Sequence, residues 1–148
     1  MSSSASQLDD FATADAVQAA FYEAFARGDR RAMQRLWIDT DDAVCVHPTG
    51  DALLGRALID GSWAGILAGG GAGKIEFEPI ATSASPDLAI FTGYEHITPA
   101  GSRIPYPPVL ATNIYRKTPL GWRMLAHHAS PIMQPRPSLP ATPGDTRH

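Results

Sequence analysis

The sequence predicts an α+β fold: a cone in which three N-terminal helices pack on one face of a curved antiparallel sheet. Up to Leu67, apolar residues recur at helical spacing. From Lys74 onward they alternate with polar residues, and turns rich in proline and glycine separate the alternating runs. Such a cone has an open mouth, and the space between helices and sheet is a natural place for a small ligand.

Local signals place the helices. Thr13 is expected to cap a first helix that ends at Gly28, and Asp29 to cap a second, shorter one. Residues 58–67 form the third helix, and the glycine run at 69–73 ends it. The apolar positions expected to be buried are Val17, Phe21, Ala24, Phe25, Met33, Leu36, Trp37, Ile59, Trp63, Ile66 and Leu67.

Alternation and turn residues place the strands. Residues 43–47 read as a short strand that Pro48 ends. Pro105, Pro107 and Pro108 cannot donate ladder hydrogen bonds, so the third long strand should begin irregularly or lie on an edge. The four longer strands are predicted at residues 75–81, 88–98, 103–117 and 122–130.

The chain is long enough for one domain with a real core. Residues 1–12 are small and polar and are expected to form a mobile lead, and residues 13–131 the folded domain. Residues 132–148 are rich in proline and lack apolar periodicity, which predicts an extended or disordered arm.

Composition excludes several classes of function. The net charge of −3 disfavours a nucleic-acid binder, which needs a basic face. No apolar run is long enough to span a membrane, and the N-terminus lacks the features of a signal peptide. The lone Cys45 cannot form an internal disulfide. We therefore expect a cytoplasmic protein without a metal or other cofactor.

The order of elements and short patterns resembles the NTF2-like superfamily, which includes ketosteroid isomerases and SnoaL-like polyketide cyclases. The resemblance covers roughly residues 13–131. It implies the cone (cystatin-like) fold and a small carbonyl compound as ligand. It is carried by Gly28-Asp29, Asp41-Asp42-Ala43-Val44, His47-Pro48, Gly55-Arg56, Ser62-Trp63 and Gly121-Trp122-Arg123-Met124.

The resemblance also implies roles for single residues. In ketosteroid isomerase an Asp is the general base, and a Tyr and a protonated Asp hold the oxyanion. The matching positions here are His47 for the base, Asn113 for the oxyanion Asp and Phe21 for the Tyr. All three depart from the isomerase, so steroid isomerisation is not expected. A His base and an amide donor instead suit proton abstraction beside a carbonyl, cyclisation, or addition and removal of water.

The sequence leaves open whether the side chains of His128, Ser130 and Glu95 face the interior of the cone. Strict alternation from Met124 and Ala126 would turn His128 and then Ser130 inward and His127 outward. Glu95 either faces the cone, where it could pair with a His, or is a solvated or interface carboxylate, which we prefer. His47 could instead bond only a backbone carbonyl or solvent.

A metal site of His47, His128 and Glu95 is not expected, because the spacing is atypical. The expected pocket lining is Phe21, Trp37, Trp63, Phe91, Glu95 and Ser130.

The sequence thus predicts a SnoaL-like protein that binds a small apolar carbonyl compound. Catalysis would be that of an isomerase, cyclase or hydratase/dehydratase, with His47 as base and Asn113 and His128 as polarising or orienting groups. The alternative is a non-enzymatic module for ligand binding or dimerisation. We also expect a homodimer formed through the open face of the sheet, because a large exposed apolar patch is costly. The candidates for that surface are Ile90, Tyr94, Ile114 and Trp122.

Overall fold

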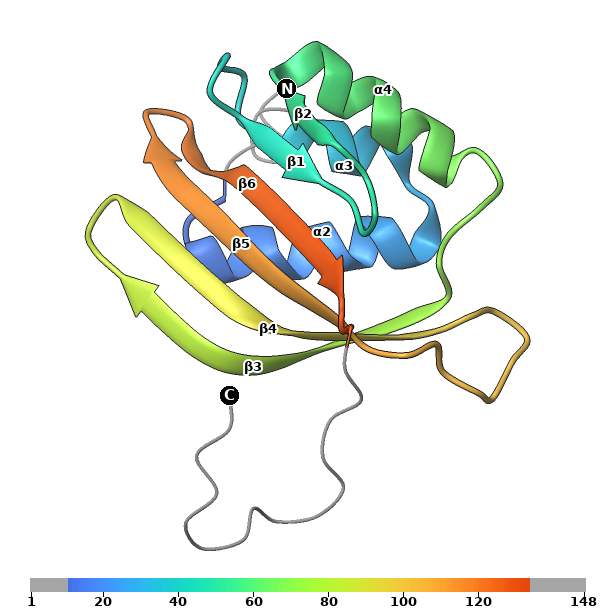
Figure 1. Cartoon of the computed structure of the whole chain (residues 1–148). Helices are drawn as coiled ribbons and strands as arrows, with labels where there is room; N and C mark the ends of the chain where they lie inside the picture. The colour runs from blue at the N-terminus through green and yellow to red at the C-terminus, as the bar shows by residue number, and fades with distance from the viewer. Residues whose placement is uncertain (1–10, 134–148) are drawn as a thin grey trace, which may run out of the picture.

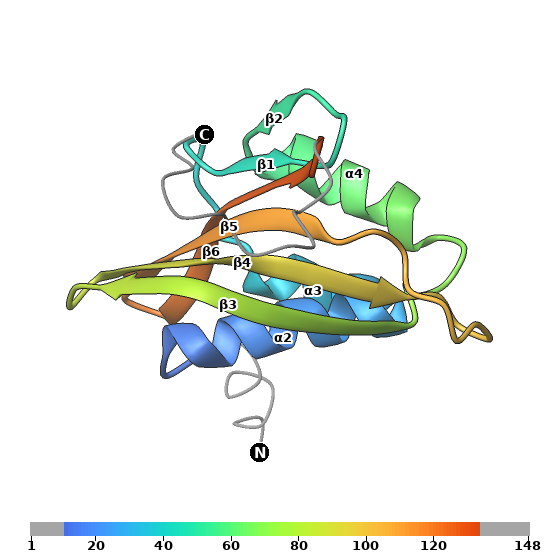
Figure 2. The ribbon, with the colours of Figure 1, turned by 60° about the horizontal axis from the view of Figure 1, so that its bottom comes forward.

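The computed structural model describes residues 11–133, so most of the predicted lead and arm lies outside the described residues. The helices cover one face of a sheet (Figures 1 and 2), as the sequence predicts. The elements are α2 (Ala14–Arg27), α3 (Arg30–Leu36), β1 (Val44–Val46), β2 (Ala52–Leu54), α4 (Arg56–Leu67), β3 (Lys74–Ala84), β4 (Leu88–Thr98), β5 (Val109–Thr118) and β6 (Gly121–Pro131).

The helix boundaries follow the predicted signals. The Thr13 side chain accepts a hydrogen bond from the backbone N–H of Ala16, and Asp29 accepts one from Ala32. Gly28 ends α2 with φ of 75°, a left-handed conformation that glycine adopts without steric cost. Local chemistry therefore sets both ends of α2 and the start of α3.

The sheet has six strands in the order β2-β1-β6-β5-β4-β3. Two features were not predicted: the short strand β2, and the parallel pairing of β1 with β6. β5 begins at Val109, later than the predicted residue 103, so the proline-rich residues precede the strand. The parallel pairing matters for function, because it brings the end of β1 beside the middle of β6.

A β-bulge interrupts β6 at Leu125. Tyr115 pairs with Met124, but its neighbour Ile114 pairs with Ala126, so Leu125 is an extra residue in the ladder. Because a one-residue insertion reverses the facing of every residue beyond it, Met124 and His127 lie on the same side of the sheet. The alternation assumed in the sequence therefore fails in the middle of β6.

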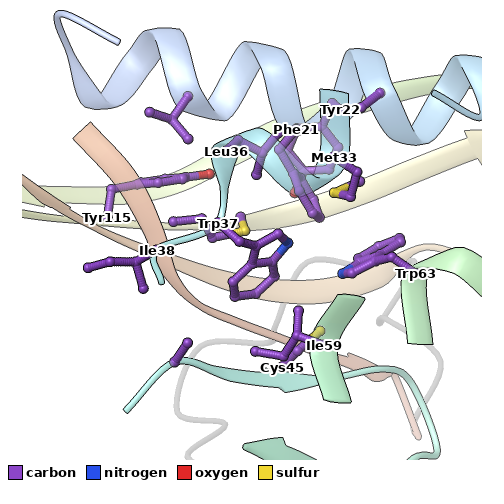
Figure 3. Close-up of a cluster of buried hydrophobic side chains, with 14 of the residues drawn as sticks. Phe21, Tyr22, Met33, Leu36, Trp37, Ile38, Cys45, Ile59, Trp63 and Tyr115 are labelled. Atoms are coloured by element: carbon purple, nitrogen blue, oxygen red, sulfur yellow. The ribbon is translucent and has the colours of Figure 1, made fainter. Parts of the chain in front are cut away.

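The core lies between α2, α3, α4 and the concave face of the sheet. Figure 3 shows the rings of Trp37 and Trp63 between α2 and β1, with Phe21 reaching toward them from α2. Both tryptophans are about 1% exposed. No helix within residues 11–133 is both long and apolar enough to cross a membrane.

Candidate functional site

A row of side chains crosses the inner face of the sheet. Register places Phe91 of β4 opposite Asn113 of β5, Asn113 opposite His127 of β6, and His127 opposite Cys45 of β1. Asn113 and His127 are at most 2% exposed. The row therefore carries an amide and an imidazole into the interior of the cone.

His127, not His128, faces the interior, so the predicted facing of the two histidines was wrong. The bulge at Leu125 is the cause, because it shifts the alternation by one residue. His128 is exposed on the outer face, and Ser130 shares that face. Neither residue lines the interior, where the sequence had placed both.

The inward residues form one buried chain of hydrogen bonds. An amide oxygen only accepts, so His127 donates from Nδ1 to Asn113 Oδ1, at 2.6 Å. The Asn113 amide donates to the Tyr22 hydroxyl at 2.9 Å and to Gln18 Oε1 at 3.1 Å. The Tyr22 hydroxyl donates to Glu95 Oε2 at 2.6 Å. The chain therefore runs in one direction, from His127 through Asn113 and Tyr22 to Glu95.

These hydrogen bonds exclude the role of oxyanion donor that the sequence assigned to Asn113. Both amide hydrogens are already donated, to Tyr22 and Gln18, and the side chain has no exposed surface. Asn113 therefore has no N–H left for the oxyanion that the sequence assigned to it. Its amide oxygen instead fixes the orientation and tautomer of His127.

Burial sets the protonation of the buried groups. Loss of solvation lowers the pKa of His127 to about 3, and the nearby His47 and His128 add to the effect, so the ring is neutral at pH 7. Loss of solvation raises the pKa of Glu95 to about 7, although the hydrogen bond from Tyr22 opposes the shift. The chain thus joins a neutral imidazole to a carboxyl group that titrates near neutrality.

Glu95 was expected to be solvated or at an interface, and that preference was wrong. Its side chain is 3% exposed, and its partner is Tyr22 rather than a histidine. Phe77 pairs with it from β3, and the Phe77 ring lies 5.5 Å from that of Tyr22. Glu95 therefore belongs to the interior, beneath the first helix.

His47 turns toward the interior at the end of β1. Its Nε2 lies 2.6 Å from Ser62 Oγ and 3.7 Å from Cys45 Sγ. Its ring packs edge-on against Trp63 at 4.9 Å and lies 6.5 Å from the ring of His127. Burial lowers the pKa of His47, which favours the neutral ring. These contacts place the His47 ring on the inner side of the sheet, and they do not test its chemical role.

The predicted lining residues divide into two groups. Phe21, Trp37 and Trp63 are fully buried and pack in the core, where Phe21 contacts the His127 ring at 4.8 Å. Phe91 is half-buried and packs edge-on against Tyr115. Trp37 lines a hollow between the end of α3 and the β5–β6 hairpin, whereas Phe21, Trp63 and Phe91 line neither of the two hollows described below.

Sequence reasoning missed several members of the site. Tyr22, Gln18 and Tyr115 are each at most 9% exposed, and the Tyr115 hydroxyl donates to Gln18 Oε1. Gln18 and Tyr22 are one helical turn apart on α2, and this spacing of polar residues beside the apolar stripe was the available signal. Their partners on β4 and β5 are distant in sequence and carried no such signal.

Two of the hollows that residues 11–133 form lie away from these hydrogen bonds. One, of about 640 Å³, lies between the end of α3 and the β5–β6 hairpin; Arg56 and Arg116 in its wall already pair with Asp60 and Asp42. The other, of about 470 Å³, lies on the outer face of the sheet. Its lining is Val44, Leu110, Thr112, Ile114, Ala126, His128 and Ser130. Neither hollow is lined by His127, Asn113 or Glu95.

Comparison with known proteins identifies the family. The SnoaL-like domain matches residues 14–134, which is most of the chain. The chain belongs to the SnoaL-like family. No curated protein matches the sequence. The NTF2-like and cystatin-like fold of its structural neighbours confirms the predicted architecture.

Two solved structures share about a third of their sequence with this SnoaL-like protein. A putative calcium/calmodulin-dependent protein kinase type II association domain from Thiobacillus denitrificans is 33% identical, with a TM-score of 0.78 over 84% of this chain and 98% of that one. A putative dehydratase of the NTF2-like family from Streptomyces avermitilis is 35% identical, with a TM-score of 0.68 over 80% of this chain and 92% of that one.

A third neighbour shows the fold alone. A putative ketosteroid isomerase from Parabacteroides distasonis is 16% identical, with a TM-score of 0.67 over 84% of this chain and 97% of that one. Catalytic and non-catalytic names thus both occur among the neighbours, and one fold hosts many functions. The choice between them has to come from the site.

Proposed function

We propose that this SnoaL-like protein is a cofactor-free acid–base enzyme that acts on small apolar carbonyl compounds, with His47 as the base. The observation that carries the proposal is the position of His47. Its half-buried ring faces inward against Trp63, in surroundings that keep it neutral and able to accept a proton at pH 7.

Ser62 supports this role without blocking it. In the tautomer in which Nε2–H donates to Ser62 Oγ, Nδ1 is bare and can accept a proton, and the 2.6 Å contact persists once the ring is protonated. Apolar residues around the cone would hold an apolar substrate. The name of the Streptomyces avermitilis neighbour, a putative dehydratase, fits the addition or removal of water within this reaction class.

Exchange of hydrogen for deuterium beside a carbonyl tests the base directly. The wild type should catalyse this exchange in apolar ketones such as 4-phenylbutan-2-one, followed by proton NMR in D₂O. His47→Gln should lose it by about 100-fold or more, the usual contribution of a general base. His96→Gln is the matched control, because His96 is a partly exposed histidine that pairs with Glu78. Exchange that persists in His47→Gln would refute the proposal.

A second candidate is a non-catalytic module for self-association. The outer hollow favours it, because it is lined mainly by apolar side chains and lies at the centre of the open sheet face. Of the residues proposed for that face, Ile90 and Ile114 pair there, and Tyr94 pairs with Leu110. Trp122 instead packs against the core, so its assignment to the open face was wrong. The putative association domain from Thiobacillus denitrificans is the neighbour whose name fits this alternative.

A further inference from the structure

The hollow of about 640 Å³ between the end of α3 and the β5–β6 hairpin, here called the basic hollow, has an apolar floor. Trp37 and Ile38 are nearly fully buried there, whereas Leu120 on the hairpin is 68% exposed. The volume is in the range of pockets that hold a drug-sized molecule, so the hollow has room for a few side chains. An apolar side chain that covered Leu120 would remove it from water.

The charges in the wall of the basic hollow are mostly positive. Of the residues that line it, Asp39 is acidic and five are basic, namely Arg35, Arg56, Arg116, Lys117 and Arg123. Asp60 pairs with Arg56 and Asp42 with Arg116, and neither aspartate lines the hollow. With these two partners counted, basic residues still outnumber acidic ones by five to three. In a protein whose net charge is −3, the hollow therefore attracts negative charge.

Phe11 fixes the course of the chain beside this wall. The backbone N–H of Trp122 donates to the carbonyl oxygen of Phe11 at 2.8 Å, and the Arg123 guanidinium lies 5.5 Å from the centre of the Phe11 ring. A Cβ added at Gly121 would lie 2.8 Å from the same carbonyl oxygen, so glycine permits this close approach. Phe11 is thus held next to Arg123, which lines the hollow.

The residues that precede Phe11 complement the hollow. They are Leu8-Asp9-Asp10, and residues 1–10 contain no basic side chain. Consecutive Cα atoms lie about 3.8 Å apart, so the Cα atoms of Asp10 and Asp9 are at most about 4 and 8 Å from that of Phe11. Chain connectivity therefore keeps two carboxylates within reach of the basic wall, with a leucine one residue beyond them.

We propose that the basic hollow is the docking site of the acidic segment Leu8-Asp9-Asp10 of the same chain. The two carboxylates lie against the basic wall, and Leu8 covers the exposed side chain of Leu120. The segment then joins the start of the domain to the end of α3 and to the hairpin from which β6 begins. This docking is separate from the proposed function, because His47 does not line the hollow.

The short tether favours this occupant over others. A segment attached by a short linker meets its site at an effective concentration in the millimolar range. A free anion would have to be supplied at a comparable concentration to compete. A second copy of the chain would have to displace a segment that the anchored Phe11 already holds beside the site.

NMR spectroscopy of the full chain at low ionic strength tests the docking. In the wild type, the backbone order parameters of Asp9 and Asp10 should be close to about 0.85, the value of ordered backbone. The Leu8 methyl groups should show a nuclear Overhauser effect to those of Leu120, because the proposal places the two side chains in contact.

A double variant removes two positive charges from the wall. In Arg35→Gln/Lys117→Gln the order parameters of the segment should fall below about 0.6, and the Overhauser effect should be lost. Both substituted side chains are exposed, so the substitutions leave the core intact. The matched control is Arg30→Gln/Arg103→Gln, which removes the same charge at exposed positions outside the lining and should leave both signals unchanged.

Salt provides a second measurement that does not depend on any substitution. In about 1 M NaCl the Debye length shortens to about 3 Å, so the order parameters should fall in the wild type as well. Order parameters below about 0.6 in the wild type at low salt would overturn the proposal. Order that neither the double variant nor salt reduces would also overturn it.

Two further outcomes would assign the hollow to a different occupant. An Overhauser effect seen only between differently labelled chains in a mixed sample would show docking on a second copy, and would overturn docking within one chain. Shifts of the Leu120 signals on addition of millimolar phenylacetate, together with low order parameters for Asp9 and Asp10, would show a site for free anions and would likewise overturn the proposal.

Discussion

Replacing Asn113 with leucine should destabilise the protein by about 3–4 kcal/mol. The substitution keeps the branched shape of the side chain but removes three hydrogen bonds, and the cost depends on what each partner retains. Within residues 11–133, His127 loses the one hydrogen bond of its side chain, and a buried group left unpaired costs about 1–3 kcal/mol. Tyr22 still donates to Glu95, and Gln18 still accepts from Tyr115, so each of these losses is closer to about 0.5–1 kcal/mol.

Urea denaturation followed by circular dichroism at pH 7 measures this cost. Thr112→Val is the control, because Thr112 is the next residue on β5, faces outward and makes one long hydrogen bond to Thr92; it should change stability by at most about 0.5 kcal/mol. In the Asn113→Leu background, His127→Leu should cost far less than it does in the wild type, giving a coupling of about 1.5–3 kcal/mol. A cost for Asn113→Leu below about 1 kcal/mol, or strict additivity, would refute the reasoning.

Two further predictions concern pH and assembly. Burial raises the pKa of Glu95 from 4.5 to about 7, so the stability it contributes is complete below pH 4.5 and is lost as the pH rises to about 7. The stability of Glu95→Gln relative to the wild type should therefore rise by something on the order of 3 kcal/mol between pH 4.5 and 8 in urea titrations, and a constant difference would contradict this. We also predict a homodimer through the outer sheet face: sedimentation of the wild type at micromolar concentration should exceed the 15.8 kDa of one chain, and Ile114→Glu should reduce it to that mass. A wild type that sediments as a single chain would exclude the dimer.

The outline of the fold could be predicted because its signals are local. The Thr13 and Asp29 caps, the Gly28 terminator and the helical spacing of Val17 and Phe21 act within a few residues, so they can be read without the tertiary structure. The same holds for alternation along β4, where the predicted boundaries match the strand. His47 could be placed at the end of its strand because Pro48 follows it directly.

The site was decided by contacts between segments that are distant in the sequence. At Leu125, β6 has one residue more than the facing part of β5, and this bulge turns His127 rather than His128 inward. Pairing of β1 with β6 then brings His47 close to His127. Glu95 lies 73 positions from its hydrogen-bond partner Tyr22, and only the packing of α2 on the sheet removes that carboxyl group from water. Local sequence thus determined which elements form, whereas register and burial, which depend on the whole fold, determined which polar side chains meet and how they ionise.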